Sequence, residues 1–198
     1  LYVSVSGLWG VLITDVLQFV VKLGMTIVLA VVAVRAAGGV DGILAHVPHE
    51  RLEVLPPLDA AWMPAITLAV YLGVQWWAAW YPGAEPGGGG YVAQRIFAAR
   101  TERDGVLATL WFNVAHYCVR SWPWIFTALS AYVLYPDLRG AHPSDPEAGY
   151  VRVMIDHLPP SLRGLMMAGF LAAYMSTVAT HLNWGASYLV RDLYARFI

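Results

Sequence analysis

Cysteine and charge are scarce in this sequence. Cys118 is the single cysteine, which excludes an internal disulfide and leaves no thiolate cage for a metal ion. Asp, Glu, Lys and Arg make up 13% of the chain, compared with about 25% in ordinary soluble domains. The net charge is −1 and the basic residues form no run, so the sequence lacks the electrostatic footprint of a nucleic-acid-binding protein.

Apolar residues make up most of the chain. Hydrophobic side chains account for 59% of the chain, and the mean hydropathy is +0.56. The nine Trp residues suit the interfaces between membrane and water. We therefore expect an all-α membrane protein in contact with the lipid bilayer. The chain begins at Leu1 within an apolar pattern and shows no signal peptide, so we interpret it as an internal piece of a longer protein.

Four segments are long and apolar enough to cross a bilayer, which takes about 20 residues of helix. They cover approximately residues 7–35, 62–82, 105–135 and 162–190. Residues 36–61 and 136–160 are predicted as polar loops, and residues 95–104 as a short charged connection. Arg residues gather on the side of this connection, so the positive-inside rule predicts that it is cytoplasmic and that both loops are extracytoplasmic.

The fourth apolar segment contains a line of polar side chains. No Asp, Glu, Lys or Arg occurs in residues 164–190, yet Ser176, Thr180, Asn183 and Ser187 follow one another at spacings of four, three and four. These positions share one face of an α-helix, and Thr177 widens the line. Such a line either binds a neighbouring helix through hydrogen bonds or forms a cation site from hydroxyl and carbonyl oxygens.

A polar stripe also marks the first segment, where Asp15, Gln18 and Lys22 lie on one helix face. One interpretation is a water-lined path through the membrane. The other is that Asp15 lies at the water interface and Lys22 extends along the helix to reach water.

Glycine and charge interrupt the middle of the chain. Residues 82–90 read PGAEPGGGG, which cannot continue a regular helix. This run is either an aqueous loop or a broken helix that lines a cavity in the membrane. In the third segment Arg120 needs a partner or water, since an intramembrane Arg costs roughly 2.5–3.5 kcal/mol. Glu85 and Asp15 are the expected partners, and Pro123 predicts a kink.

Four motifs occur in the same order as in a known transporter family. They are SGLWGVLITDVLQ (residues 6–18), YVAQRIFAAR (91–100), HLPPSLRGLMMAGFLAA (157–173), and AAYMST (172–177) followed by Asn183 and RDLY (191–194). The sequence thereby resembles the sodium:solute symporter family across nearly its whole length. Ile13 replaces a Trp of the family pattern. Glu85 and the glycines after it replace a helical approach to the Gln-Arg pair, so the resemblance does not name the solute.

The resemblance implies a LeuT-like inverted-repeat transporter fold, of which about four transmembrane helices are present. It implies sodium-coupled symport of a small organic solute across the plasma membrane by alternating access, with Na⁺ as coupling ion and no organic cofactor. The sodium ligands would be the Ala173 carbonyl and the Ser176 and Thr177 hydroxyls, together with carbonyls from other helices of the full-length transporter. Asp15 would lie near the route of sodium release. The substrate and gating candidates are Gln75, Glu85, Gly87, Gly88, Gly89, Gly90, Tyr91 and Arg120.

Two other classes of function remain open from the residues alone. One is a non-transporting sensor or structural subunit of the same fold. The other is a membrane-embedded enzyme that uses His116, His181 and Glu85. The sequence contains no metal-binding spacing such as His-Glu-x-x-His to support the enzyme.

Overall fold

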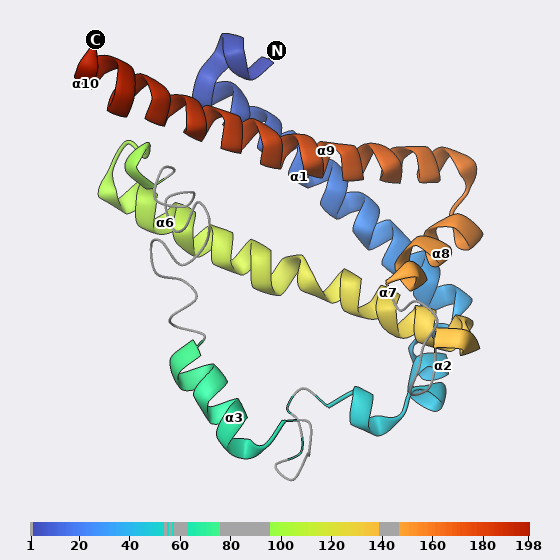
Figure 1. Cartoon of the computed structure of the whole chain (residues 1–198). Coiled ribbons are helices and arrows are strands. Elements are labelled where there is room, and N and C mark those ends of the chain that lie inside the picture. The colour runs from blue at the N-terminus through green and yellow to red at the C-terminus, as the bar shows by residue number, and fades with distance from the viewer. Residues whose placement is uncertain (1, 54, 56, 58–62, 76–95, 139–146) are drawn as a thin grey trace. The chain divides into compact units, whose positions relative to one another are not determined.

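The computed structural model describes residues 2–53, 55, 57, 63–75, 96–138 and 147–198 (Figure 1). The described elements are helices, without a strand among them, as an all-α protein requires. The chain divides into two compact units. Unit 1 comprises Leu1–His46 and Arg120–Ile198, and unit 2 comprises Val47–Val119.

Helix α1 (Tyr2–Ala36) is the central element of unit 1. Gly7 interrupts its helical geometry with φ 57° and ψ −147°, a conformation that is costly for residues with a Cβ atom. The remainder, Gly7–Ala36, has a mean hydropathy of 2.3 and is long enough to cross a bilayer. A helix therefore covers the residues of the first predicted span.

Helix α9 (Pro160–Ser187) is the second long apolar helix of unit 1. Pro160 occupies its first position, where the missing N–H of proline costs nothing. The helix continues as a π-helical segment η5 (Tyr188–Tyr194) and the short α10 (Ala195–Phe197). Helical geometry thus extends beyond residue 190 and includes RDLY, because no Gly or Pro follows Ser187 to end the helix.

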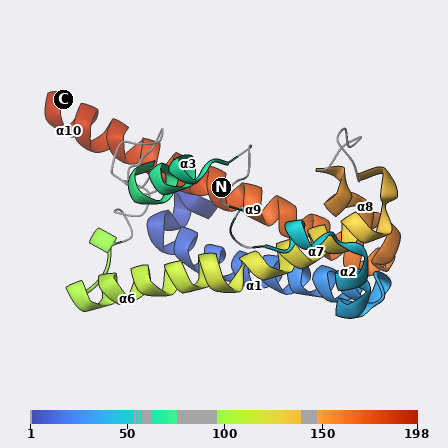
Figure 2. The same ribbon diagram turned by 90° about the horizontal axis from the view of Figure 1, so that it is seen from below.

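The core of unit 1 lies where α1 meets α7 (Ser121–Leu134), α8 (Ala148–His157) and α9. Leu29 of α1, Val153 of α8 and Met166 of α9 are each at most 2% exposed. Figures 1 and 2 show α8 at the same end of unit 1 as α2 (Gly39–His46). This end is therefore the most densely packed part of the unit.

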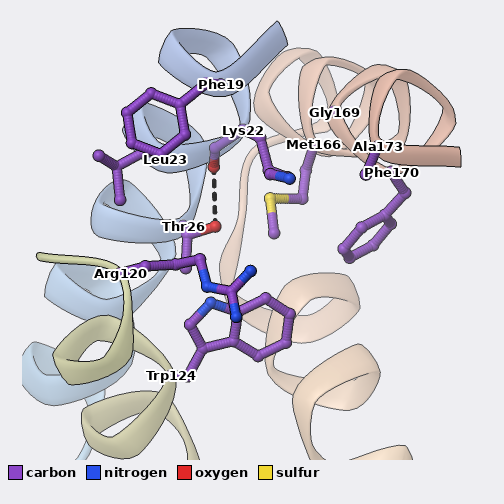
Figure 3. Close-up of a pocket in the computed structure, with 10 residues that line it drawn as sticks. All are labelled: Phe19, Lys22, Leu23, Thr26, Arg120, Trp124, Met166, Gly169, Phe170 and Ala173. Atoms are coloured by element: carbon purple, nitrogen blue, oxygen red, sulfur yellow. Dashed lines mark hydrogen bonds between the residues drawn. The ribbon is translucent and has the colours of Figure 1, made fainter. Parts of the chain in front are cut away.

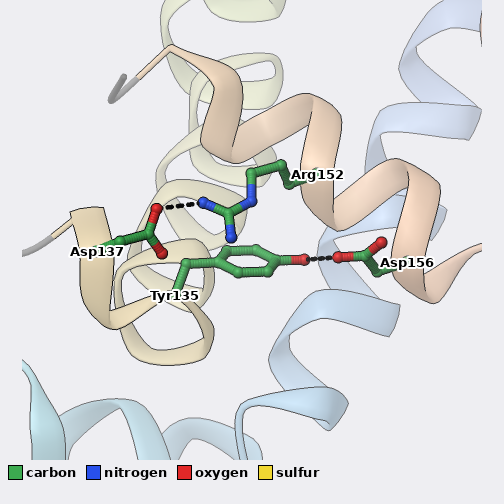
Figure 4. Close-up of polar contacts among 4 residues, drawn as sticks. All are labelled: Tyr135, Asp137, Arg152 and Asp156. Carbon is green, nitrogen blue, oxygen red and sulfur yellow. Dashed lines mark hydrogen bonds and ion pairs between the residues drawn. The ribbon is translucent and has the colours of Figure 1, made fainter. Parts of the chain in front are cut away.

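A polar cluster fastens α8 to the end of α7 (Figure 4). Arg152 of α8 donates a hydrogen bond from Nη1 to Asp137 Oδ2 at 2.6 Å, and its guanidinium lies 4.1 Å from the Tyr135 ring centroid. The Tyr135 hydroxyl donates to Asp156 Oδ2 at 2.7 Å. The bond to Asp137 raises the pKa of Arg152, so the guanidinium remains charged in this cluster.

Both polar connections expected as loops contain helices. Residues 36–61 include α2 and the 3-10 turn η1 (His49–Arg51), while residues 136–160 include the 3-10 turn η4 (Pro136–Leu138) and α8. These predicted loops between the spans are therefore partly helical. Their polar residues lie on helices because Ile43 and Val153 supply apolar side chains that are buried against unit 1.

Unit 2 contains α3 (Ala65–Val70), the π-helical η2 (Tyr71–Gln75), α6 (Glu102–Asn113) and the π-helical η3 (Val114–Val119). Thr101 caps α6, since its hydroxyl accepts a hydrogen bond from the Asp104 N–H at 3.1 Å. The connection expected at 95–104 is therefore already helical from Glu102. Arg120 separates η3 from α7 with a backbone that stays helical, at φ −78° and ψ −31°, and Pro123, three residues later, has no N–H to donate to the preceding turn.

Two described helices, Gly7–Ala36 and Pro160–Phe197, are long and apolar enough to cross a membrane. Ala65–Gln75 is apolar but shorter, and the rest of the second expected span, residues 76–82, lies outside the described residues. The count of four spans, and the sides of the membrane on which their connections lie, stay predictions.

The packing of α1 predicts unequal effects of the same substitution at two of its leucines. Leu29 is 0% exposed and Leu17 is 63% exposed. We expect Leu29→Ala to lower the free energy of unfolding by about 2–5 kcal/mol, as in other buried sites, and Leu17→Ala to lower it far less. Thermal denaturation of the purified protein in detergent measures both. Equal losses of stability in the two variants would contradict this assignment of the core.

Candidate functional site

A hydrogen bond joins the polar faces of α1 and α9. The Ser176 hydroxyl of α9 donates to Asp15 Oδ1 of α1 at 2.6 Å, the length of a charge-assisted bond. The two residues are 161 positions apart in the sequence. Farther along, a Cβ atom placed on Gly169 would lie 3.7 Å from the Lys22 Cα. From the first contact to the second, the residue number increases in α1 and decreases in α9, so the two helices pack antiparallel.

The other predicted sodium ligands lie on the same turn of α9. The Thr177 hydroxyl donates to the Ala173 carbonyl oxygen at 3.1 Å, which places these two oxygens side by side. Ser176 is half-buried towards α1, whereas Thr177 is exposed in this structure. A hydroxyl that donates one hydrogen bond keeps its lone pairs available for a cation. The turn therefore brings the Thr177 and Ala173 oxygens together, while the Ser176 hydroxyl is bonded to α1.

Ser176 differs from six other hydroxyls of the apolar helices in its hydrogen-bond partner. Thr14, Thr26, Thr127, Ser130, Thr177 and Ser187 each donate to a carbonyl of their own helix three or four residues earlier. Such local bonds satisfy the hydroxyl without a partner helix. Ser176 instead reaches the carboxylate of α1, so its position is fixed by the packing of two helices.

Gln18 brings a further oxygen to this contact. With Asp15 opposite Ser176 and Lys22 opposite Gly169, the antiparallel register places Gln18 at the level of Ala173. Its Oε1 atom is buried and has no hydrogen-bond partner among the described residues. A buried acceptor without a partner lowers the stability of the folded protein by about 1–3 kcal/mol. A bound cation, or a hydrogen-bond donor outside the described residues, would remove that penalty. The polar stripe predicted on α1 thus meets α9, where Ser176 bonds Asp15.

A cavity of about 160 Å³ lies next to this contact, between α1, α7 and α9 (Figure 3). Lys22 and Arg120 bring two cationic side chains to its wall, and Ala173 borders it as well. Trp124 and Phe170 supply aromatic walls, and Tyr150 of α8 stacks on Trp124 with ring centroids 4.9 Å apart. The cavity therefore combines positive charge with apolar surface beside the oxygens of α9.

Sequence reasoning identified Arg120 as a residue in need of a partner and did not identify the wall that it shares with Lys22. The spacing of residues along each helix could have indicated part of this wall. Thr26 follows Lys22 by four residues, and Trp124 follows Arg120 by four, so each pair shares a helix face. What the spacings could not indicate is that the two faces meet.

The remaining predicted residues divide into described and undescribed positions. Gln75 ends the π-helical segment η2 and is exposed. Glu85, Gly87, Gly88, Gly89, Gly90 and Tyr91 lie outside the described residues. The pairing of Glu85 with Arg120 and the role of the glycine run therefore stay predictions.

The histidines of the alternative enzyme lie in surroundings of different kinds. His116 stacks on Phe112 at 5.2 Å between ring centroids and meets Tyr117 edge-on at 4.7 Å. His181 is exposed on α9. Among the described residues, no group of three His, Cys, Asp or Glu side chains is arranged to hold a metal ion. The site on α1 and α9 instead offers neutral oxygens and one carboxylate, the ligands that hard cations prefer.

Comparison with known proteins gives relatives among transporters. Sodium/myo-inositol cotransporter 2 of Mus musculus is 27% identical over 224 residues, which cover 98% of this chain and 32% of the relative. The protein of the same name from Rattus norvegicus gives the same values, and that from Oryctolagus cuniculus is 25% identical over 226 residues. The chain thus spans about a third of the length of these relatives. No solved structure matches it.

The family match covers residues 1–198 and carries the description "Sodium:solute symporter family". It includes every motif on which the resemblance was based, and it confirms that resemblance. The family and the named relatives are membrane transporters, and the two long apolar helices fit a membrane protein. The chain belongs to the sodium:solute symporter family.

Proposed function

We propose that this chain is a segment of a transporter that couples the movement of a small organic solute to that of sodium across the plasma membrane. The observation that carries the proposal is the hydrogen bond from Ser176 to Asp15, between two apolar helices and beside the oxygens of Ala173 and Thr177. Membership of the family supports coupling to sodium. The remaining helices of a LeuT-like inverted-repeat fold would complete the transporter around the four predicted spans.

The proposed sodium site uses the Ala173 carbonyl and the hydroxyls of Ser176 and Thr177. The buried Oε1 atom of Gln18 supports this location, because it is an acceptor that lacks a donor among the described residues. The bond to Ser176 places the Asp15 carboxylate at the edge of the site. There its negative charge would attract a departing sodium ion, which is the role expected of a residue on the release route.

Alternating access would open this contact to one side of the membrane at a time. The α1–α9 contact is suited to such a change, because small residues rather than large ones bring the two backbones together at Gly169. We base the proposal of alternating access for this chain on its family and on this packing.

A flux measurement tests the proposal as a whole. The full-length protein is reconstituted in vesicles with an imposed sodium gradient and offered a panel of radiolabelled solutes, of which myo-inositol is the first because of the names of the relatives. We expect uptake of at least one solute that stops when potassium replaces sodium. Sodium binding without any flux would instead favour the sensor subunit. If the protein shows no sodium binding and no flux, the proposed function is rejected.

Substitution of the two hydroxyls separates a sodium site from simple helix packing. Ser176→Ala or Thr177→Ala removes an oxygen ligand. Loss of about 1.4 kcal/mol of sodium binding would raise the half-saturating sodium concentration about tenfold. Thr177→Ser keeps the oxygen and should have a much smaller effect. Equilibrium binding of radiolabelled sodium to the purified protein measures each variant.

Ser187→Ala is the matched control, because its hydroxyl lies on the same helix and is bonded locally to the Trp184 carbonyl at 2.7 Å. We expect no change in sodium affinity in this variant. If Ser176→Ala and Thr177→Ala lower stability but leave the binding curve unshifted, the hydroxyls serve helix packing only and the site is rejected.

The contact between Asp15 and Ser176 predicts non-additive kinetics. Asp15→Asn removes the charge and keeps the size of the side chain, so we expect slower uptake at saturating sodium. Because Ser176→Ala breaks the same hydrogen bond, the double variant should lose less activity than the sum of the single losses in free energy. Initial rates of sodium-driven uptake measure the coupling.

Asp41→Asn, at an exposed position on α2, serves as the control for loss of a carboxylate and should leave the rate unchanged. Strictly additive losses at Asp15 and Ser176 would show that the two residues act independently, against the role assigned to their bond.

A further inference from the structure

Lys22 places an ammonium group near the middle of an apolar helix. It is the only lysine of the sequence, and about 20 Å of helix separates it from either end of the apolar stretch Gly7–Ala36. That distance is greater than the length of a lysine side chain. A charged side chain at this depth in a membrane helix needs polar partners inside the protein.

The Lys22 side chain is directed towards α9. The two helices are close at this level, because a Cβ atom placed on Gly169 would lie 3.7 Å from the Lys22 Cα. Figure 3 shows the side chain extending from α1 towards the helix that carries Gly169 and Ala173, which line the same cavity. Long side chains of a helix also lean towards its N-terminus, which for Lys22 is the direction of Gln18. The ammonium therefore extends towards the level at which Gln18 and Ala173 face each other.

Oxygen atoms at this level suit an ammonium as well as a sodium ion. Gln18 Oε1 is buried and has no hydrogen-bond partner among the described residues. The Ala173 carbonyl oxygen, which accepts the hydrogen bond from Thr177, is one of the proposed sodium ligands. An ammonium carries the same unit charge as sodium, and its N–H groups donate to such acceptors.

The charged side chains that act on Lys22 are Asp15 and Arg120. Asp15 lies seven residues earlier on the same helix, where it accepts the hydrogen bond from Ser176, so its charge attracts the ammonium in the direction of the proposed sodium site. Arg120 is a like charge at the cavity wall. Helix α9 contains no Asp or Glu, so Asp15 is the carboxylate that acts on Lys22 from this part of the contact.

We propose that Lys22 is a tethered cation that competes with sodium for the oxygens at the level of Gln18 and Ala173. In the structure the ammonium lies at the cavity of about 160 Å³, and rotation about the bonds of its flexible stem carries it to these oxygens. A sodium ion that binds must return the ammonium to the cavity, where the two positive charges still repel each other. Lys22 thus weakens sodium binding and accelerates sodium release. The inference rests on the proposed function and adds to its ion site a residue that sets the affinity.

Sodium affinity in the full-length protein tests the competition. Lys22→Met removes the charge and keeps an unbranched side chain of similar length, and Lys22→Gln removes it while keeping a polar end. Because a competing cation is lost, equilibrium binding of radiolabelled sodium should give a half-saturating concentration about tenfold lower in both variants. Lys22→Arg keeps the charge and should remain close to the wild type.

Arg163→Gln is the control for loss of a positive charge. Arg163 lies on α9 and donates from Nε to the Leu158 carbonyl at 2.7 Å, away from the cavity, so its loss should leave sodium affinity unchanged. A similar gain of affinity in Arg163→Gln would show a general effect of charge and would overturn the inference.

Chemical modification reports the position of the ammonium. The full-length protein is acetylated with acetic anhydride in sodium or in choline, and mass spectrometry of the peptide that contains Lys22 gives the rate. We expect faster acetylation in sodium, because the ammonium then leaves its acceptors for the cavity. In Thr177→Ala, which lacks one proposed sodium ligand, the same increase should require about tenfold more sodium.

The outcomes separate this inference from the proposed function. Equal or weaker sodium binding in Lys22→Met and Lys22→Gln overturns the competition and leaves sodium symport standing. Equal rates of acetylation in sodium and in choline also overturn it, because the ammonium would then keep its position when sodium binds. If the wild-type protein binds no sodium, the proposed function itself is rejected.

Discussion

A polar group inside an apolar helix bundle must find its partner within the protein, because hydrocarbon offers none. Thr26, Thr127 and Ser130 meet this constraint locally, each by donating to a carbonyl of its own helix. Ser176 meets it through Asp15 of another helix. That bond fixes the register of α1 against α9, and with it the level at which Gln18, Ala173 and the cavity face one another.

The same register places two kinds of binding chemistry next to each other. On one side are the neutral oxygens of α9, which suit a hard monovalent cation. On the other is a cavity whose charged lining residues, Lys22 and Arg120, are both cationic. Ala173 belongs to both.

The dense end of unit 1 provides the rigid part of this arrangement. Leu29, Val153 and Met166 form its core, and the cluster of Arg152 with Asp137, Tyr135 and Asp156 holds α8 against α7 (Figure 4). Exposed ion pairs contribute little stability by themselves, so the apolar core and the stacked ring of Tyr135 carry most of the stabilisation. Asp15 and Ser176, by contrast, lie where fewer side chains are buried.

The sequence alone determined the class of the protein, its helical character and its family. A scarcity of charge and long apolar runs can be satisfied only by helices buried in lipid or in one another, and the four motifs identified the symporter family, which the full-length match confirms. Thr177 also follows Ala173 by four residues in the sequence, and in the structure its hydroxyl donates to the Ala173 carbonyl oxygen. These properties follow from residues that are near one another in the chain.

Only the tertiary structure decided which faces meet. The hydrogen bond between Asp15 and Ser176 joins residues 161 positions apart, and no periodicity within either helix specifies its partner helix or the register between them. For the same reason the sequence could not place Lys22 and Arg120 on one cavity, nor show that α2 and α8 form within polar connections, where contacts with α1 and α7 bury their few apolar side chains. Local pattern fixes the face of a helix, whereas packing between distant segments fixes what that face binds.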